Sequence, residues 1–97
     1  MLDSFEIKRE DNSAGGRYVV YLPDGSEAEM TYRHTAPGVV SIDHTGVPPQ
    51  FRSAGIALKL VEAGIEGARA DGHKIVPLCS YVQAQFRRHP QWADLLA

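Results

Sequence analysis

A short segment near the middle of the chain has residue types and spacing suited to holding an anion. It reads Arg52-x-x-Gly55-x-Ala57 and stands between an apolar, strand-like run and the start of a helical pattern. The first N–H groups of a helix have no partner within it, and the helix dipole adds partial positive charge there. Gly55 permits a sharp turn and the close approach of a large anion. The segment predicts a phosphate site that suits a pyrophosphate, and loop closure with helix capping is the alternative.

Three further side chains have chemistry of their own. Cys79, the only cysteine, stands where a predicted strand gives way to a helix, whose N-terminus activates a thiol. A buried, inert thiol is the alternative. His44 suits a base for an ammonium substrate, and on its strand it is predicted to share the face of Val40 and Ile42, as a histidine at the edge of the core would. Tyr81 is a candidate proton donor to a leaving group, with packing as the alternative.

The first half of the chain has the pattern of four strands joined by short turns. Alternation and β-branched residues predict the strands at 5–10, 17–22, 27–33 and 39–45. Residues 5–10 are expected to be half-buried, and His34 and His73 are expected to lie on the surface. The short connections, rich in glycine, proline and asparagine, imply an antiparallel meander.

The second half changes to a helical pattern after Pro48 and Pro49, which end the fourth strand. A helix is predicted from about Gly55 to Asp71, with an apolar stripe on one side and charges on the other. A short buried strand at 74–78 is expected to run parallel to the fourth strand, followed by a helix at 80–88 and a final helical turn opened by Pro90. The fold class is α+β, in the order β-β-β-β-α-β-α, with the 52–57 segment at the carboxyl end of the fourth strand.

Length and composition limit the class of protein. The 97 residues predict a single domain over 1–97, with a net charge of −2 that favours neither nucleic acid nor an anionic membrane. No apolar run approaches the length of a membrane span, and the start of the chain has no signal-peptide pattern. One cysteine forms no internal disulfide and no cluster suggests a metal, so a reduced, cytoplasmic protein is expected.

Three stretches, together with the Arg-x-x-Gly-x-Ala segment and the order of elements, carry a resemblance to a known family. They are residues 44–49 (His-Thr-Gly-Val-Pro-Pro), 76–82 (Val-Pro-Leu-Cys-Ser-Tyr-Val) and 87–90 (Arg-Arg-His-Pro). The chain resembles the GNAT acetyltransferase superfamily, and more narrowly its smallest members, which have about this length. The resemblance covers the second half of the chain, since the N-terminal strands fit in order but carry no specific motif.

The resemblance implies a minimal GNAT-like fold and an N-acetyltransferase that moves an acetyl group from acetyl-coenzyme A to an amine. The fourth and fifth strands would be parallel and splayed, and the pantetheine arm would enter between them and pair with backbone near Thr45 and Val47. The acetyl group would then lie near Cys79. The pyrophosphate would rest on the amides of the loop, namely those of Arg52, Ser53, Ala54, Gly55, Ile56 and Ala57.

Several roles stay open within this reading. Cys79 would accept the acetyl group as a thioester or protonate the departing thiolate, and Tyr81 is a second donor to that thiolate. His44 or a water chain would take the proton of the amine. The small members often carry an acidic residue where this chain has Gly46. A non-catalytic acetyl-coenzyme A binder, or a partner-binding α+β module, is therefore the rival reading; a monomer or weak homodimer is expected in either case.

Overall fold

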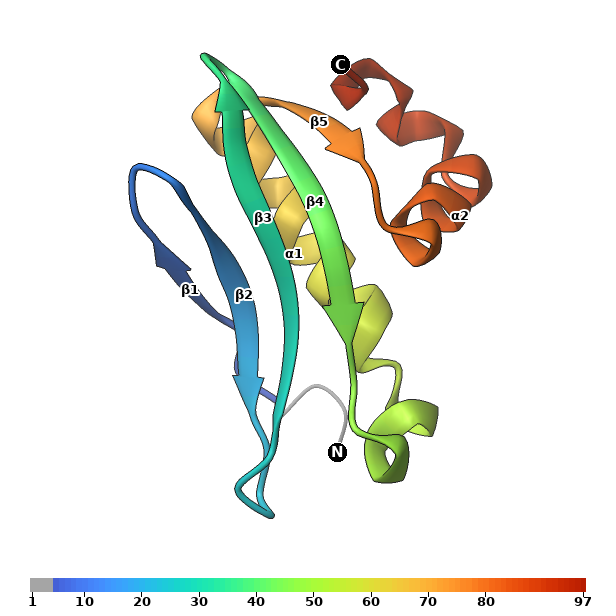
Figure 1. Ribbon diagram of the computed structural model, residues 1–97. Helices are drawn as coiled ribbons and strands as arrows, with labels where there is room; N and C mark the ends of the chain where they lie inside the picture. Colours follow the sequence, from blue (N-terminus) through green and yellow to red (C-terminus); the bar gives the residue numbers. More distant parts are fainter. Residues whose placement is uncertain (1–4) are drawn as a thin grey trace.

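A computed structural model describes residues 5–97, which form one five-stranded sheet with helices packed against it (Figure 1). The strands lie in the order β1-β2-β3-β4-β5; β1 to β4 are antiparallel neighbours and β5 runs parallel to β4. The predicted α+β fold, with its meander and parallel fifth strand, is confirmed. The elements are β1 (Lys8–Asp11), β2 (Gly15–Tyr21), β3 (Glu27–Ala36), β4 (Val39–Gly46), the 3-10 helix η2 (Pro49–Ala54), α1 (Ile56–Asp71), β5 (Lys74–Pro77), α2 (Ser80–Arg88) and the 3-10 helix η3 (Pro90–Leu95).

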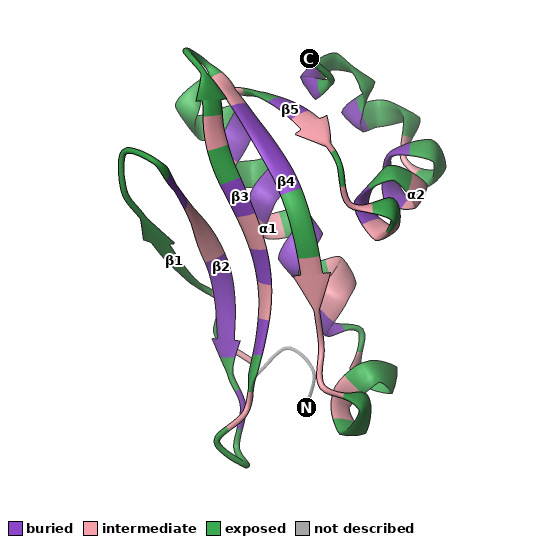
Figure 2. Ribbon diagram, in the orientation of Figure 1, coloured by how far each residue is buried: buried purple, intermediate pink, exposed green. Residues whose placement is uncertain are grey.

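Helix α1 crosses one face of the sheet, and the opposite face is left uncovered (Figure 1). The buried residues of α1 recur at helical spacing and meet the buried alternate residues of the central strands (Figure 2). Helix α2 and η3 pack beside α1 and close the end of the core near β5. The large side chains at the centre of this core that are fully buried are those of Met30, Leu60, Val61, Ile75 and Val82.

Two segments differ from the sequence-based prediction. Strand β1 begins at Lys8 and all of its residues are exposed, so the half-buried strand predicted at 5–10 is wrong. Phe5 and Ile7 instead pack against the core from just before the strand. The segment between β4 and α1, expected to be a loop, forms η2, and the ring of its Phe51 meets that of Phe5 edge-on with centroids 6.3 Å apart. Aromatic packing thus holds the segment that precedes α1.

A bulge in β4 changes which way its last residues face. Tyr32 pairs with Ile42 and Thr31 pairs with His44, so Asp43 is an extra residue with no partner on β3. One extra residue reverses the alternation of faces beyond it. Thr45 consequently stands opposite the buried Met30, whereas His44 lies on the uncovered face with Thr31. The prediction that His44 shares the face of Val40 and Ile42 is therefore wrong.

The expectation that His34 and His73 lie on the surface is also wrong. Strand β3 runs on to Ala36, three residues beyond its predicted end, which puts His34 on the core side with Tyr32. The His34 ring meets the His73 ring edge-on at 5.9 Å, and both residues are half-buried. Nε2 of His34 lies 3.1 Å from Asp11 Oδ2, and this carboxylate also accepts a hydrogen bond from the Tyr32 hydroxyl.

Candidate active site

Strands β4 and β5 part halfway along β4. Their pairing ends with Ile42 opposite Pro77, and the Ile42 carbonyl then accepts hydrogen bonds from the backbone N–H groups of Leu78 (2.9 Å) and Cys79 (3.1 Å). These two bonds turn the chain away from β4 and into α2. Among the described residues, no strand pairs with that side of β4 beyond this point. The expected splay is therefore present, and it leaves a backbone edge free at Thr45.

A groove of about 470 Å³ opens beside this free edge. It brings together seven of the candidate site residues named from the sequence, which come from β4, η2, α1, α2 and the links between them, and adds Gly46. Its lining consists of His44, Thr45, Gly46, Val47, Arg52, Gly55, Ala57 and Tyr81. The end of β4, the start of α1 and the start of α2 therefore meet around one hollow.

The start of α1 at this groove has the sharp turn at a glycine that the sequence predicts. Gly55 joins η2 to α1 with φ 75° and ψ 16°, a left-handed conformation that glycine adopts at little cost. No side chain of the described part of the chain caps the N-terminus of α1, so among these residues its first N–H groups remain available. Nε of Arg52 donates to the Val47 carbonyl (3.2 Å), which ties η2 back to the end of β4. The guanidinium thus contacts backbone here, and no carboxylate within residues 5–97 pairs with it.

Three of the predicted phosphate-binding residues do not line the groove with their side chains. Ser53 is exposed on η2, Ala54 packs partly against the core, and Ile56 is 2% exposed. Ile56 belongs to the apolar stripe that holds α1 on the sheet. Only the backbone amides of these residues remain as candidate contacts for an anion.

Cys79 does not line the groove but contacts a residue that does. It is half-buried at the N-cap of α2, and its thiol donates to the Thr45 hydroxyl across an Sγ–Oγ1 distance of 3.7 Å. Thr45 itself lines the groove. Tyr81, the second residue of α2, also lines it, and partial burial raises the pKa of the Tyr81 phenol above its ordinary value. Tyr81 is thus protonated at neutral pH, as a proton donor must be.

Gly46 has a role that sequence reasoning missed. A Cβ atom built at Gly46 would lie 2.9 Å from Nε2 of His44, closer than such atoms pack. The absence of a side chain at 46 therefore leaves the space that the His44 imidazole occupies at the mouth of the groove. The bulge turns His44 toward the mouth of the groove, and the glycine leaves room for its ring. Neither the alternation of residue types nor a sequence motif predicts this arrangement.

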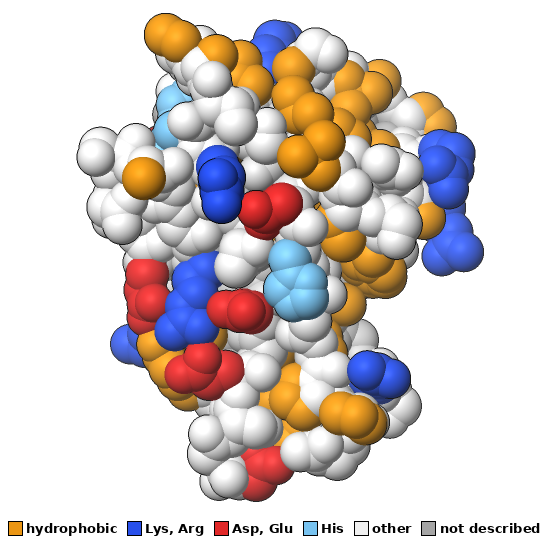
Figure 3. All heavy atoms as spheres, in the orientation of Figure 1, with side chains coloured by type: hydrophobic (Ala, Val, Ile, Leu, Met, Phe, Trp, Pro, Cys, Tyr) orange, Lys and Arg blue, Asp and Glu red, His pale blue; other side chains and the backbone are white. Residues whose placement is uncertain are grey.

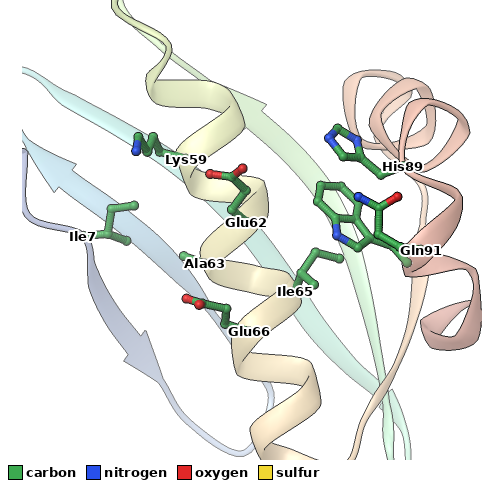
Figure 4. A pocket seen from close by; sticks show the side chains of 9 residues that line it. Ile7, Lys59, Glu62, Ala63, Ile65, Glu66, His89 and Gln91 are labelled. Atoms are coloured by element: carbon green, nitrogen blue, oxygen red, sulfur yellow. The ribbon is translucent and has the colours of Figure 1, made fainter. Parts of the chain in front are cut away.

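A second hollow, of about 480 Å³, lies along the outer side of α1 (Figure 4). Glu62 and Glu66 project from α1 into the space between Ile7 and the C-terminal segment that carries His89 (Figure 4). The ring of His89 stacks on that of the buried Trp92 with centroids 3.9 Å apart, so Trp92 packs the C-terminal segment onto the body. The two carboxylates of this hollow outnumber the single lysine that lines it, Lys59, so the hollow suits a phosphate less well than the groove at the start of α1 does.

None of the helices within residues 5–97 is long and apolar enough to cross a membrane. In the same range, no three histidine, cysteine, aspartate or glutamate side chains come close enough together to hold a metal ion.

Comparison with known proteins decides the family. Residues 17–95 match the GCN5-related N-acetyl-transferase family. The chain belongs to this family. Its fold is also similar to the solution NMR structure of a GCN5-like candidate N-acetyltransferase from Staphylococcus aureus, with a TM-score of 0.74 and 29% identity over 96% of this chain and 88% of that one. The resemblance to the GNAT superfamily is thereby confirmed.

Membership of the GCN5-related N-acetyltransferase family places this chain among the acyltransferases. The matched residues include all of β4, η2, α1 and α2, the elements whose residues line the groove.

Proposed function

We propose that this protein transfers the acetyl group of acetyl-coenzyme A to an amine. The observation that carries the proposal is the groove at the end of β4, where a free strand edge meets an uncapped helix start. A free edge suits the amide groups of a pantetheine arm, and uncapped N–H groups suit a pyrophosphate. Both features fit the same elongated ligand in one hollow, with a family of acetyltransferases as support.

In this proposal the pyrophosphate binds the backbone amides of residues 52–57, and the pantetheine arm pairs with the free edge of β4 near Thr45 and Val47. Gly55 allows the phosphates to approach the start of α1 closely. The bound coenzyme supplies an acetyl thioester as the group to be transferred. The N–H of Val47 is a candidate donor to the thioester carbonyl, where it would stabilise the charge that develops on oxygen.

The protein groups then move two protons. His44, exposed at the mouth of the groove, takes the proton that the ammonium must lose before its nitrogen can attack. The amine nitrogen forms the new carbon–nitrogen bond as the carbon–sulfur bond breaks. Tyr81 donates a proton to the departing thiolate. As the amide forms, the nitrogen releases its second proton, which returns to Tyr81 directly or through solvent, and His44 passes the first proton to solvent, so charge and atoms balance.

A second candidate function is binding of acetyl-coenzyme A without catalysis, or binding of a protein partner. The specific observation in its favour is Gly46, which provides no carboxylate at the mouth of the groove. Titration calorimetry with acetyl-coenzyme A, followed by a screen of amines and peptides, separates the possibilities. Binding with turnover supports the transferase, binding without turnover on any acceptor supports the binder, and no binding supports the partner module.

Cys79 provides a further prediction. If it takes part in the chemistry, iodoacetamide is expected to label it rapidly at about pH 7 and acetyl-coenzyme A to slow the labelling. The physical reason is its place at the start of α2, 3.7 Å from a hydroxyl that lines the groove. Intact mass would also reveal an acetyl adduct on the thiol.

The variant Cys79→Ala separates the possible roles of this thiol. Loss of turnover with retained binding indicates chemistry at sulfur. Full activity, or wild-type labelling that accelerates only on unfolding, assigns Cys79 to packing. In that case the amine attacks the bound thioester directly.

A further inference from the structure

The side chain of Thr45 contacts both the groove and the thiol that lies outside its lining. Thr45 lines the groove, and its hydroxyl accepts a hydrogen bond from the Cys79 thiol across 3.7 Å. Within residues 5–97, no other side chain shares a hydrogen bond with this sulfur. The Thr45 hydroxyl is therefore the polar group that connects the sulfur with the groove.

The backbone brings these two side chains together. The bulge at Asp43 reverses the alternation of faces, so Thr45 lies opposite the buried Met30, on the side of the sheet that α1 covers. At the other partner, the Ile42 carbonyl accepts a hydrogen bond from the backbone N–H of Cys79 at 3.1 Å. Sheet pairing thus fixes both ends of the contact, which costs less entropy than a contact between two mobile surface groups.

The sulfur lies in a partly apolar part of the molecule. Cys79 is one of the half-buried residues that pack against the core, whereas its neighbour Leu78 is 58% exposed. Hydrophobic side chains gather over the region of β4 and β5, and most acidic side chains of this view lie over β2 and β3 (Figure 3). Because partial burial removes water, an anion at such a place needs hydrogen-bond donors from the protein.

Two sources of donors are present for an anionic sulfur. The first is the N-terminus of α2, where Cys79 is the N-cap and no described side chain makes a capping hydrogen bond. The second is the hydroxyl of Thr45. A hydroxyl hydrogen rotates, so this group accepts a hydrogen bond from the thiol and donates one to the thiolate. It therefore serves the sulfur in both ionisation states, which a backbone amide does not.

We infer that Thr45 is a positioning residue, whose hydroxyl holds the Cys79 sulfur toward the groove and stabilises its thiolate. The inference rests on the proposed acetyl transfer, in which Cys79 accepts the acetyl group or donates its proton to the departing coenzyme. In both roles the thiol loses its proton, so a hydroxyl that stabilises the thiolate assists either one. This role of the side chain is separate from the backbone pairing proposed for Thr45.

The test replaces Thr45 by valine, which is also β-branched and has nearly the same shape but no hydroxyl. Iodoacetamide reacts with the thiolate: the thiol proton goes to solvent, and the sulfur–carbon bond forms as iodide leaves. We expect the pH of half-maximal labelling to rise by about one unit in Thr45→Val, and labelling below that pH to be about tenfold slower, because one charge-assisted hydrogen bond is lost. The maximal rate at high pH should not change, since the sulfur stays equally accessible.

Three further variants control for shape and folding. Thr45→Ser keeps the hydroxyl and should label within about twofold of the wild type at every pH. Thr35→Val removes a hydroxyl that shares a hydrogen bond with Ser41 near the other end of β3, and should change nothing. If circular dichroism shows that Thr45→Val does not fold, Thr45→Ala also removes the hydroxyl and should shift the labelling in the same direction. The titratable and charged side chains around this part of the groove stay the same in every variant, namely His44, Arg52, Glu62, Tyr81 and Arg88.

An unchanged pH dependence of labelling without the hydroxyl, or an equal shift in Thr45→Ser, would overturn the inference. So would labelling that is slower by one factor at every pH, which would indicate a change of access alone. A wild-type thiol that reacts only on unfolding would overturn it as well. Labelling needs neither coenzyme nor amine, so the outcome is distinct from that of the proposed function, which fails if calorimetry detects no binding of acetyl-coenzyme A.

Discussion

Replacement of Gly55 by aspartate is expected to weaken acetyl-coenzyme A binding by more than about a hundredfold, because it puts a carboxylate where the pyrophosphate should lie. The N-terminus of α1 has no side-chain cap, and Gly55 is the residue that joins it to η2. A negative charge there would both occupy the uncapped N–H groups and repel the phosphates. The wild type should gain thermal stability with acetyl-coenzyme A, whereas Gly55→Asp should gain none.

The matched control for this experiment is Gly55→Asn. Asparagine has nearly the same shape as aspartate and tolerates the left-handed backbone of Gly55 better than most residues, but it has no charge. We expect Gly55→Asn to keep part of the thermal shift. Circular dichroism should show that both variants fold. An undiminished shift in a folded Gly55→Asp protein would mean that the phosphates bind elsewhere.

Replacement of His44 by alanine is expected to lower turnover about a hundredfold below about pH 8, with a smaller loss at higher pH. The reason is that an alkylamine is almost fully protonated at neutral pH and needs a base, whereas hydroxide replaces that base as the pH rises. Affinity for acetyl-coenzyme A should change little, since the proposed contacts of the coenzyme are with backbone. The measurement is a pH–rate profile of both proteins beside a calorimetric titration.

A weakly basic acceptor amine provides the control for His44. Such an amine is already neutral at the pH of the assay, so the loss in His44→Ala should be much smaller for it than for an alkylamine. A structural role for His44 would lower turnover of both acceptors equally. If the rate depends on pH in the same way in the variant and the wild type, His44 likewise has a structural role.

Local patterns alone determined most of the elements. Helix α1 was predictable because its apolar residues repeat at helical spacing, and its start because Gly55 precedes that repeat. The strands of the meander were predictable because short turns separate alternating runs. The groove lining was anticipated through the family resemblance, whose motifs lie on the segments that meet there.

The tertiary structure decided how the site residues face one another. The bulge at Asp43 arises from the pairing of β3 with β4, so alternation along β4 by itself assigned His44 to the wrong face. Register across the sheet also put Glu29 beside Gly46, although 17 positions separate them in the chain. Neighbouring residues set the local preference for helix or strand, but hydrogen bonding between distant strands sets the register. The register in turn determines which side chains reach the groove.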